Sequence, residues 1–147
     1  MTYESYIKAR LVDFVVEEAF NSGGVEAMLA VAQVLANRVN AGWQGGDWRR
    51  VIRSAPDYRG TIRLRTIQSS AELDVDPRDG NFRELMRRID DVYYGTADDA
   101  NVNNDSGKSL YYAELHNINR PWFRDHILKD LESHPRLASV GQITFFG

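Results

Sequence analysis

Residues 3–40 read YESYIKARLVDFVVEEAFNSGGVEAMLAVAQVLANRVN, and this stretch decides the fold. In its first half Ile7, Leu11 and Phe14 recur at helical spacing, and Glu18 continues the same face at i+11. A second face, which is polar, carries Arg10, Asp13 and Glu17. The pattern predicts an amphipathic helix from about residue 3 to residue 20, with a carboxylate at the end of its apolar stripe.

The second half of this stretch predicts another helix after a glycine turn. Asn21-Ser22-Gly23-Gly24 ends the first helix, because glycine takes the left-handed position that follows a helix at little cost. From Val25 to about Asn40 the apolar face is broad and rich in small residues, which allows another backbone to approach closely. We therefore expect two consecutive helices joined by a tight turn.

Outside this stretch the predicted elements are short. They are a helix over 48–54 capped by Asp47, a strand or ordered loop over 61–67, a helix over 82–94 capped by Asp79 or Asn81, a polar loop over 97–107, a strand within 109–115, a short helix opening at Pro121, and a terminal strand over 142–146. The sum is a single α+β domain over residues 1–147, mainly α, with a small sheet and two lobes.

Composition excludes several chemistries and partners. A net charge of −3 gives no general attraction for nucleic acid. The local arginine run is either a solvated basic face or a contact for an acidic polymer or for peptide carboxylates. It comprises Arg49, Arg50, Arg53, Arg59, Arg63 and Arg65. The absence of cysteine excludes thiol catalysis and a cysteine-rich zinc site. No apolar run reaches the length that a membrane span needs.

Glu18 is the most informative polar residue. Partial burial and the negative end of its helix both disfavour the charged carboxylate, so the sequence predicts a raised pKa, as a general acid requires. Glu17 lies on the polar face and should titrate normally. The alternative is that Glu18 reaches solvent at a frayed helix end. The histidines show no metal-ligand spacing, so we expect neither a metal nor a cofactor. They are His116, His126 and His134.

Two parts of the chain match a known pattern. The first is Glu18-Ala19 and the glycine turn, followed by EAMLAVAQVLANRV over 26–39. The second comprises Gly95, Asp98-Asp99, GKSLYY over 107–112, Pro121-Trp122-Phe123 and VGQITFF over 140–146. In order and spacing these pieces resemble the SleB-type cell wall hydrolases, the spore cortex-lytic enzymes. The segment 57–90 contributes little to the resemblance.

The resemblance implies a lysozyme-like, two-lobed lytic transglycosylase that acts on peptidoglycan glycan strands. Glu18 would protonate the β-1,4 glycosidic oxygen between N-acetylmuramic acid and N-acetylglucosamine, and would then take the proton of the attacking muramoyl 6-hydroxyl. Tyr111, Tyr112 and Asn117 are the candidates for holding the sugar. From strand alternation alone, one tyrosine would lie in the core and the other on the surface. Trp122 is expected to be a core aromatic.

The sequence departs from the family pattern at three places. Asn21-Ser22 replaces a second early glutamate, Tyr112-Ala113-Glu114 replaces Tyr-Asn-Pro, and Gln142-Ile143-Thr144 replaces a segment that contains histidine. Asn117 is the candidate for the displaced asparagine. A single acid suits transglycosylation, whereas ordinary glycosidases use two. If folding brings a second acid opposite Glu18, hydrolysis becomes the better interpretation. The candidates for that acid are Asp47, Asp57, Asp98 and Asp99.

Other functions stay open at this point. The chain could be a non-catalytic peptidoglycan-binding protein or a structural protein of a phage particle. It could also be an N-acetylmuramoyl-L-alanine amidase, which would normally need zinc. The N-terminus lacks the layout of a secretory signal peptide, so we expect synthesis in the cytoplasm and action on the cell wall after release by phage lysis or delivery in a virion. The delivery partner is unknown.

Overall fold

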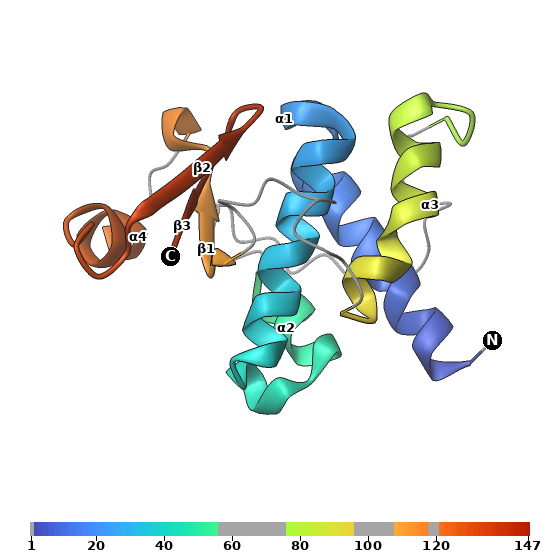
Figure 1. The fold of residues 1–147 in the computed structure, drawn as a ribbon, viewed down its shortest axis with the longest axis horizontal. Coiled ribbons are helices and arrows are strands. Elements are labelled where there is room, and N and C mark those ends of the chain that lie inside the picture. Colours follow the sequence, from blue (N-terminus) through green and yellow to red (C-terminus); the bar gives the residue numbers. More distant parts are fainter. Residues whose placement is uncertain (1, 56–75, 96–107, 118–120) are drawn as a thin grey trace.

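The computed structural model describes residues 2–55, 76–95, 108–117 and 121–147. Its helices are α1 (Tyr3–Asn40), η1 (Trp43–Gly46), α2 (Trp48–Ser54), α3 (Gly80–Tyr93), η6 (Leu115–Asn117), α4 (Pro121–Phe123) and the π-helix η7 (Arg124–Leu128). Its strands are β1 (Tyr111–Ala113), β2 (Arg136–Val140) and β3 (Ile143–Phe146). The protein is mainly helical with a small antiparallel sheet, as the sequence predicts (Figure 1).

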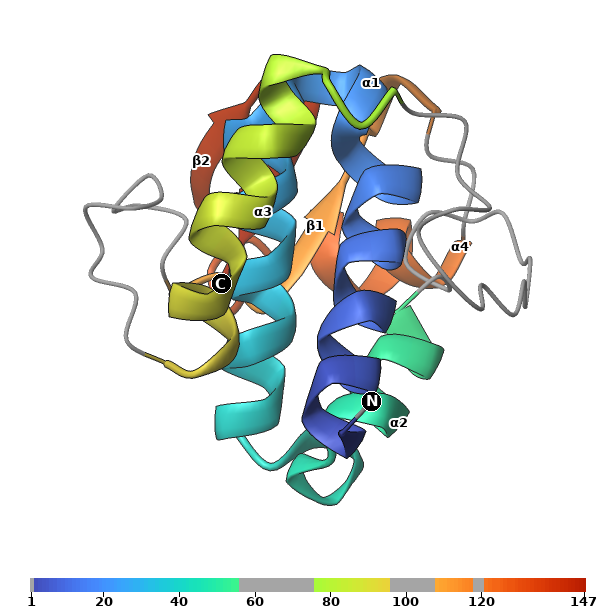
Figure 2. The ribbon, with the colours of Figure 1, turned by 90° about the vertical axis from the view of Figure 1, so that its right-hand side faces the viewer.

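Helix α1 bends back on itself at the glycine pair. Gly23 has φ 177° and ψ 20°, and Gly24 has φ 66° and ψ −150°, so neither is helical. We call residues 3–22 the first arm and residues 25–40 the second arm. The arms run antiparallel and side by side (Figure 2). The predicted pair of helices around a glycine turn is therefore confirmed, with Gly24 in the left-handed region that favours glycine.

The first arm is buried on its apolar face, as predicted, and also at one residue of the face that was predicted to be polar. Ile7, Leu11, Phe14 and Glu18 are buried as predicted, and Glu17 is exposed. The assignment of Asp13 to a polar, solvated face is wrong, because its exposed fraction is 0%. The arm is contacted from several directions, since α2, α3 and the sheet all pack against α1. Consequently residues 11–16 are buried all round the helix.

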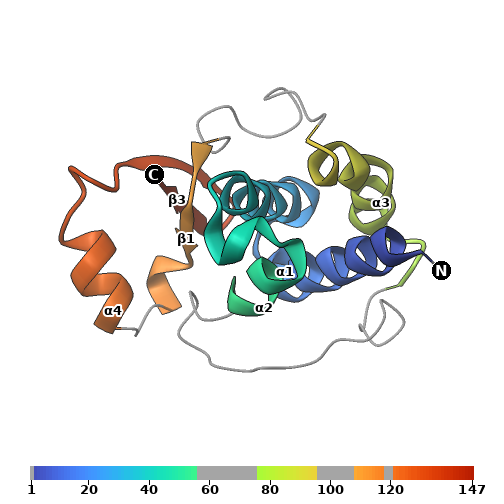
Figure 3. The same cartoon turned by 90° about the horizontal axis from the view of Figure 1, so that it is seen from below.

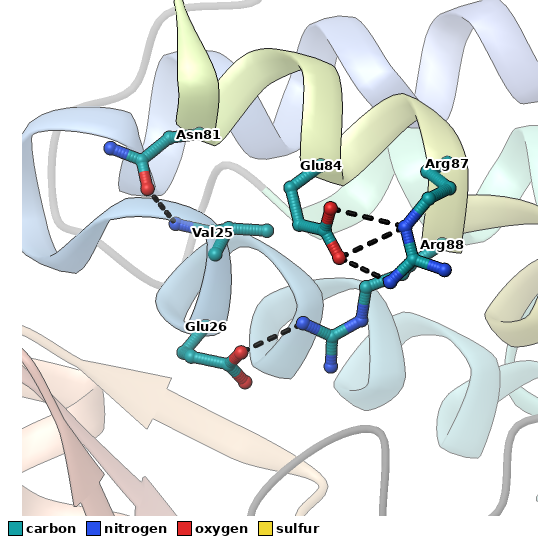
Figure 4. Close-up of polar contacts among 6 residues, drawn as sticks. All are labelled: Val25, Glu26, Asn81, Glu84, Arg87 and Arg88. Carbon is teal, nitrogen blue, oxygen red and sulfur yellow. Dashed lines mark hydrogen bonds and ion pairs between the residues drawn. The ribbon is translucent and has the colours of Figure 1, made fainter.

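Helix α3 packs along α1 and is fixed to the bend. Asp79 caps α3 by accepting hydrogen bonds from the backbone N–H groups of Asn81 and Phe82, which confirms the predicted helix start. The Asn81 side chain reaches across and accepts from the Val25 backbone N–H at 3.3 Å (Figure 4). Arg88 pairs with Glu26 at 2.7 Å in the same region. These contacts hold the start of the second arm against α3.

The sheet has strand order β1-β3-β2 and lies between two apolar clusters. Tyr112 pairs with Phe145 in the register, and both side chains join the main helical core together with Ile143. The opposite face is covered by α4 and η7, where the buried apolar residues are Ala113, Phe123, Ile127 and Phe146 (Figures 1 and 3). The sheet thus separates the helical part from the C-terminal part.

Several smaller predictions have clear outcomes. Asp47 caps α2 by accepting from the Arg50 backbone N–H, and β3 confirms the terminal strand. Trp122 is not a core aromatic, because 41% of it is exposed, while Phe123 points inward. Strand β2 was not predicted. It pairs with β3 at the edge of the sheet, and its side chains are half-buried or exposed. The segments 61–67 and 97–107 lie outside the described residues.

Among the described helices, α1 is long and apolar enough to cross a membrane, by length and composition alone. This differs from the expectation that no apolar run reaches that length. Most of the apolar window is buried inside the fold, and the helix is bent at its centre. These features are typical of the core helix of a folded domain.

Candidate active site

The last turn of the first arm is docked onto the β2–β3 hairpin by direct backbone contact. Gly141, in the hairpin turn, has φ +59°, and a Cβ there would lie 2.2 Å from the Ser22 carbonyl oxygen and 2.5 Å from the Gly23 Cα. The Gln142 backbone N–H donates to the Ser22 carbonyl at 2.8 Å. Only glycine permits this approach. The contact brings the end of the first arm against the sheet.

The second arm fixes the start of β1. The Asn37 Nδ2 donates to the Ser109 carbonyl at 2.8 Å, and the Arg38 Nε donates to the Leu110 carbonyl at 2.8 Å. Arg38 is fully buried, with its guanidinium 4.9 Å from the centre of the Trp43 ring. The Asn-Arg pair that contributes to the sequence resemblance therefore positions the strand that carries Tyr112.

Glu18 contacts Tyr112 between the Gly141 contact and the Asn37 and Arg38 contacts. The Tyr112 hydroxyl donates to Glu18 Oε2 at 3.1 Å. Tyr112 is 1% exposed and Glu18 is 8% exposed, so the carboxyl group is largely removed from water but not sealed from it. Burial penalises the charged form of a carboxyl group, and the tyrosine fixes its orientation. A carboxyl group held in this way is suited to deliver a proton.

A second buried carboxyl group lies beside the first. The Ser22 hydroxyl donates to Glu114 Oε1, and Glu114 is 7% exposed. Glu18 and Ser22 are one helical turn apart, and Tyr112 and Glu114 are two residues apart along extended backbone, which places both on one side. The two carboxyl groups are therefore held by adjacent contacts between the end of the first arm and the segment from Tyr112 to Glu114.

A histidine stands at the outer side of Glu114. The His116 Nε2 lies 4.0 Å from Glu114 Oε2, and the His116 side chain is 56% exposed. When protonated, His116 would form an ion pair with the glutamate and favour its ionised form. Contacts therefore run from Ser22, at the buried helix end, through Glu114 to the exposed imidazole of His116.

Of the predicted sugar-binding residues, the structure brings Tyr112 to Glu18 and places Tyr111 elsewhere. Tyr111 lies on the opposite face of β1, with ring centres 5.5 Å from Trp43, 6.3 Å from Trp122 and 5.0 Å from His134. Tyr112 is thus in the core, as strand alternation predicts for one of the pair, whereas Tyr111 is half-buried rather than on the surface. Asn117 ends η6, three residues after Glu114; its side chain lies outside what the structure describes.

The structure describes one of the four candidates for a second acid, and that one lies away from Glu18. Asp47 caps α2 at the end of the antiparallel arms that is remote from the bend (Figure 1). Asp57, Asp98 and Asp99 lie outside the described residues. Sequence reasoning missed Glu114. The available signal was its two-residue spacing from Tyr112 on a predicted strand, which puts both side chains on one face.

Other polar groups in the described residues offer less chemistry. Residues 2–55, 76–95, 108–117 and 121–147 contain no set of three His, Asp or Glu side chains placed to hold a metal ion. A surface hollow of about 420 Å³ at the start of α3 is lined by Gly80, Arg83, Glu84 and Arg87. There the Glu84 carboxylate is held by Arg87, which lowers the pKa of this exposed group (Figure 4). An ion-paired carboxylate is poorly suited to act as an acid.

The chain matches no protein-family model, and searches of curated proteins and of solved structures find no significant match.

Proposed function

We propose that this chain cleaves the glycan strands of peptidoglycan, with Glu18 as the catalytic acid. The observation that carries the proposal is the buried Glu18 carboxyl group, held by the Tyr112 hydroxyl at the junction between the helical part and the sheet. The resemblance of the flanking sequence to SleB-type hydrolases supplies the substrate class. In this proposal the helical part and the C-terminal part with its sheet are the two lobes of a lysozyme-like domain.

The chemistry follows from the state of Glu18. Its neutral form, favoured by burial, donates a proton to the glycosidic oxygen as the bond to the anomeric carbon of N-acetylmuramic acid breaks. The Tyr112 hydroxyl holds Glu18 Oε2 and so fixes the orientation of the carboxyl group. The resulting carboxylate sits next to the positive charge that develops on the sugar ring and stabilises it. To complete the reaction, the hydroxyl group or water that attacks the anomeric carbon loses a proton, and Glu18 returns to its protonated form.

Two matched variants test the proposal. Glu18→Gln keeps the size and the acceptor oxygen of the side chain but cannot donate an acidic proton. Glu17→Gln makes the same change on the neighbouring exposed residue. Loss of a general acid should lower the rate by about 10²- to 10⁴-fold, whereas the control should match wild type. Mass analysis of fragments released from purified peptidoglycan measures both, and a thermal melt of each variant verifies folding.

The proposal fails if Glu18→Gln releases fragments at the wild-type rate. It also fails if the wild-type protein releases none from intact or peptide-free glycan strands. Co-sedimentation with the insoluble wall would then show whether the chain binds peptidoglycan without cutting it, which is the non-catalytic alternative.

A further inference from the structure

We infer that Glu114 is a second catalytic carboxylate that activates water, so that the reaction is hydrolysis rather than transglycosylation. This inference rests on the proposed function and goes beyond it, because the resemblance implies a single acid. Glu114 is 7% exposed, and the positions of Ser22 and Tyr112 bring it to the same side of the site as Glu18. The burial of this second carboxyl group next to the proposed acid therefore needs a physical explanation.

The two carboxyl groups are held by neighbouring contacts. Ser22 follows Glu18 by one helical turn and Glu114 follows Tyr112 by two residues, so the Tyr112–Glu18 and Ser22–Glu114 hydrogen bonds form side by side. In glycosidases that use water directly, the acid and the base are about 6.5–9.5 Å apart, whereas an acid and a carboxylate nucleophile are about 5–5.5 Å apart. The first arm contacts the β2–β3 hairpin at Gly141, and β1 pairs with β3, so the backbone segments that carry Glu18 and Glu114 are held in place relative to each other.

The surroundings of the two groups favour different charge states. Glu114 accepts a hydrogen bond from the Ser22 hydroxyl, which favours its carboxylate form, and the His116 Nε2 lies 4.0 Å from Glu114 Oε2. Once Glu114 is ionised, a second negative charge nearby is disfavoured, which favours the neutral form of Glu18. The pair thereby divides into a base and an acid.

The reaction then balances with water as the co-reactant. Glu18 gives its proton to the glycosidic oxygen, and the bond between that oxygen and the anomeric carbon breaks. A water oxygen forms the new bond to the anomeric carbon while one of its protons passes to Glu114. The products are a reducing-end muramic acid and a free 4-hydroxyl on the neighbouring sugar. Proton exchange with solvent restores Glu18 as the acid and Glu114 as the carboxylate.

The test is digestion of purified glycan strands in water enriched in oxygen-18, with mass analysis of the new ends. We expect reducing-end products that carry one heavy oxygen. Glu114→Gln keeps the size of the side chain and an acceptor for Ser22 but cannot take a proton, and should lower the yield of these ends by about 100-fold or more. Glu114→Ala should regain part of its rate with added formate, because a free carboxylate can replace the missing base.

Controls separate this inference from the proposed function. Thermal melts of both Glu114 variants verify folding, and formate should not accelerate Glu18→Gln. If the wild-type protein releases 1,6-anhydro ends without heavy oxygen, or if Glu114→Gln cuts at the wild-type rate, the inference is overturned while the role of Glu18 stands. If the wild-type protein releases no ends at all, the proposed function itself is overturned.

Discussion

Gly141 offers the sharpest test of how the site is assembled. Its φ of +59° lies in the left-handed region, and a Cβ there would be 2.2 Å from the Ser22 carbonyl oxygen. That atom belongs to backbone and cannot rotate away. In Gly141→Ala the hairpin must therefore move off the end of the first arm, which breaks the 2.8 Å hydrogen bond from Gln142 to Ser22.

The cost is the sum of two effects. Alanine in the left-handed region costs about 1 kcal/mol relative to glycine. Losing the partner of a buried carbonyl costs about 1–3 kcal/mol more. The free energy of unfolding should therefore fall by about 2–4 kcal/mol, which for a chain of this length corresponds to a drop in Tm of about 6–12 °C.

Gly42→Ala is the matched control. Gly42 has φ +83°, but nothing lies within 4 Å of a Cβ built there. It should lose only the conformational part, about 1 kcal/mol, which is partly offset because alanine has fewer unfolded conformations than glycine. Urea unfolding followed by circular dichroism compares the two variants. Equal losses would refute the claim that close backbone contact at Gly141 joins the hairpin to α1.

Two further variants test the site and the helical part separately. Tyr112→Phe removes the hydrogen bond to Glu18 and should lower the cutting rate about tenfold and the free energy of unfolding by about 1 kcal/mol; an unchanged rate would show that the hydroxyl does not orient the acid. Asp79→Ala removes the cap of α3 and should lower the free energy of unfolding by about 1 kcal/mol while leaving the cutting rate per folded molecule unchanged; a loss of rate would mean that α3 takes part in the site.

Much of the helical part was predictable because its determinants are local. The spacing of Ile7, Leu11 and Phe14 gave the buried face of the first arm, and Gly23-Gly24 gave the bend. Asp47 and Asp79 gave two helix starts through hydrogen bonds to backbone groups two or three residues away. Asp13 shows the limit, since its burial depends on what packs against the helix from other directions.

In the candidate site, too, local features were predictable from the sequence and long-range contacts were not. The sequence by itself determined that Glu18 ends an apolar stripe at the last turn of a helix, because helical periodicity is written in neighbouring residues. Only the tertiary structure decided that this carboxyl group meets Tyr112, which is 94 positions away, and that Ser22 meets Glu114 at a separation of 92. Such pairings depend on how the hairpin docks on the bend. That docking is set by the space left at Gly23 and Gly141, a property of two backbones together rather than of either segment alone.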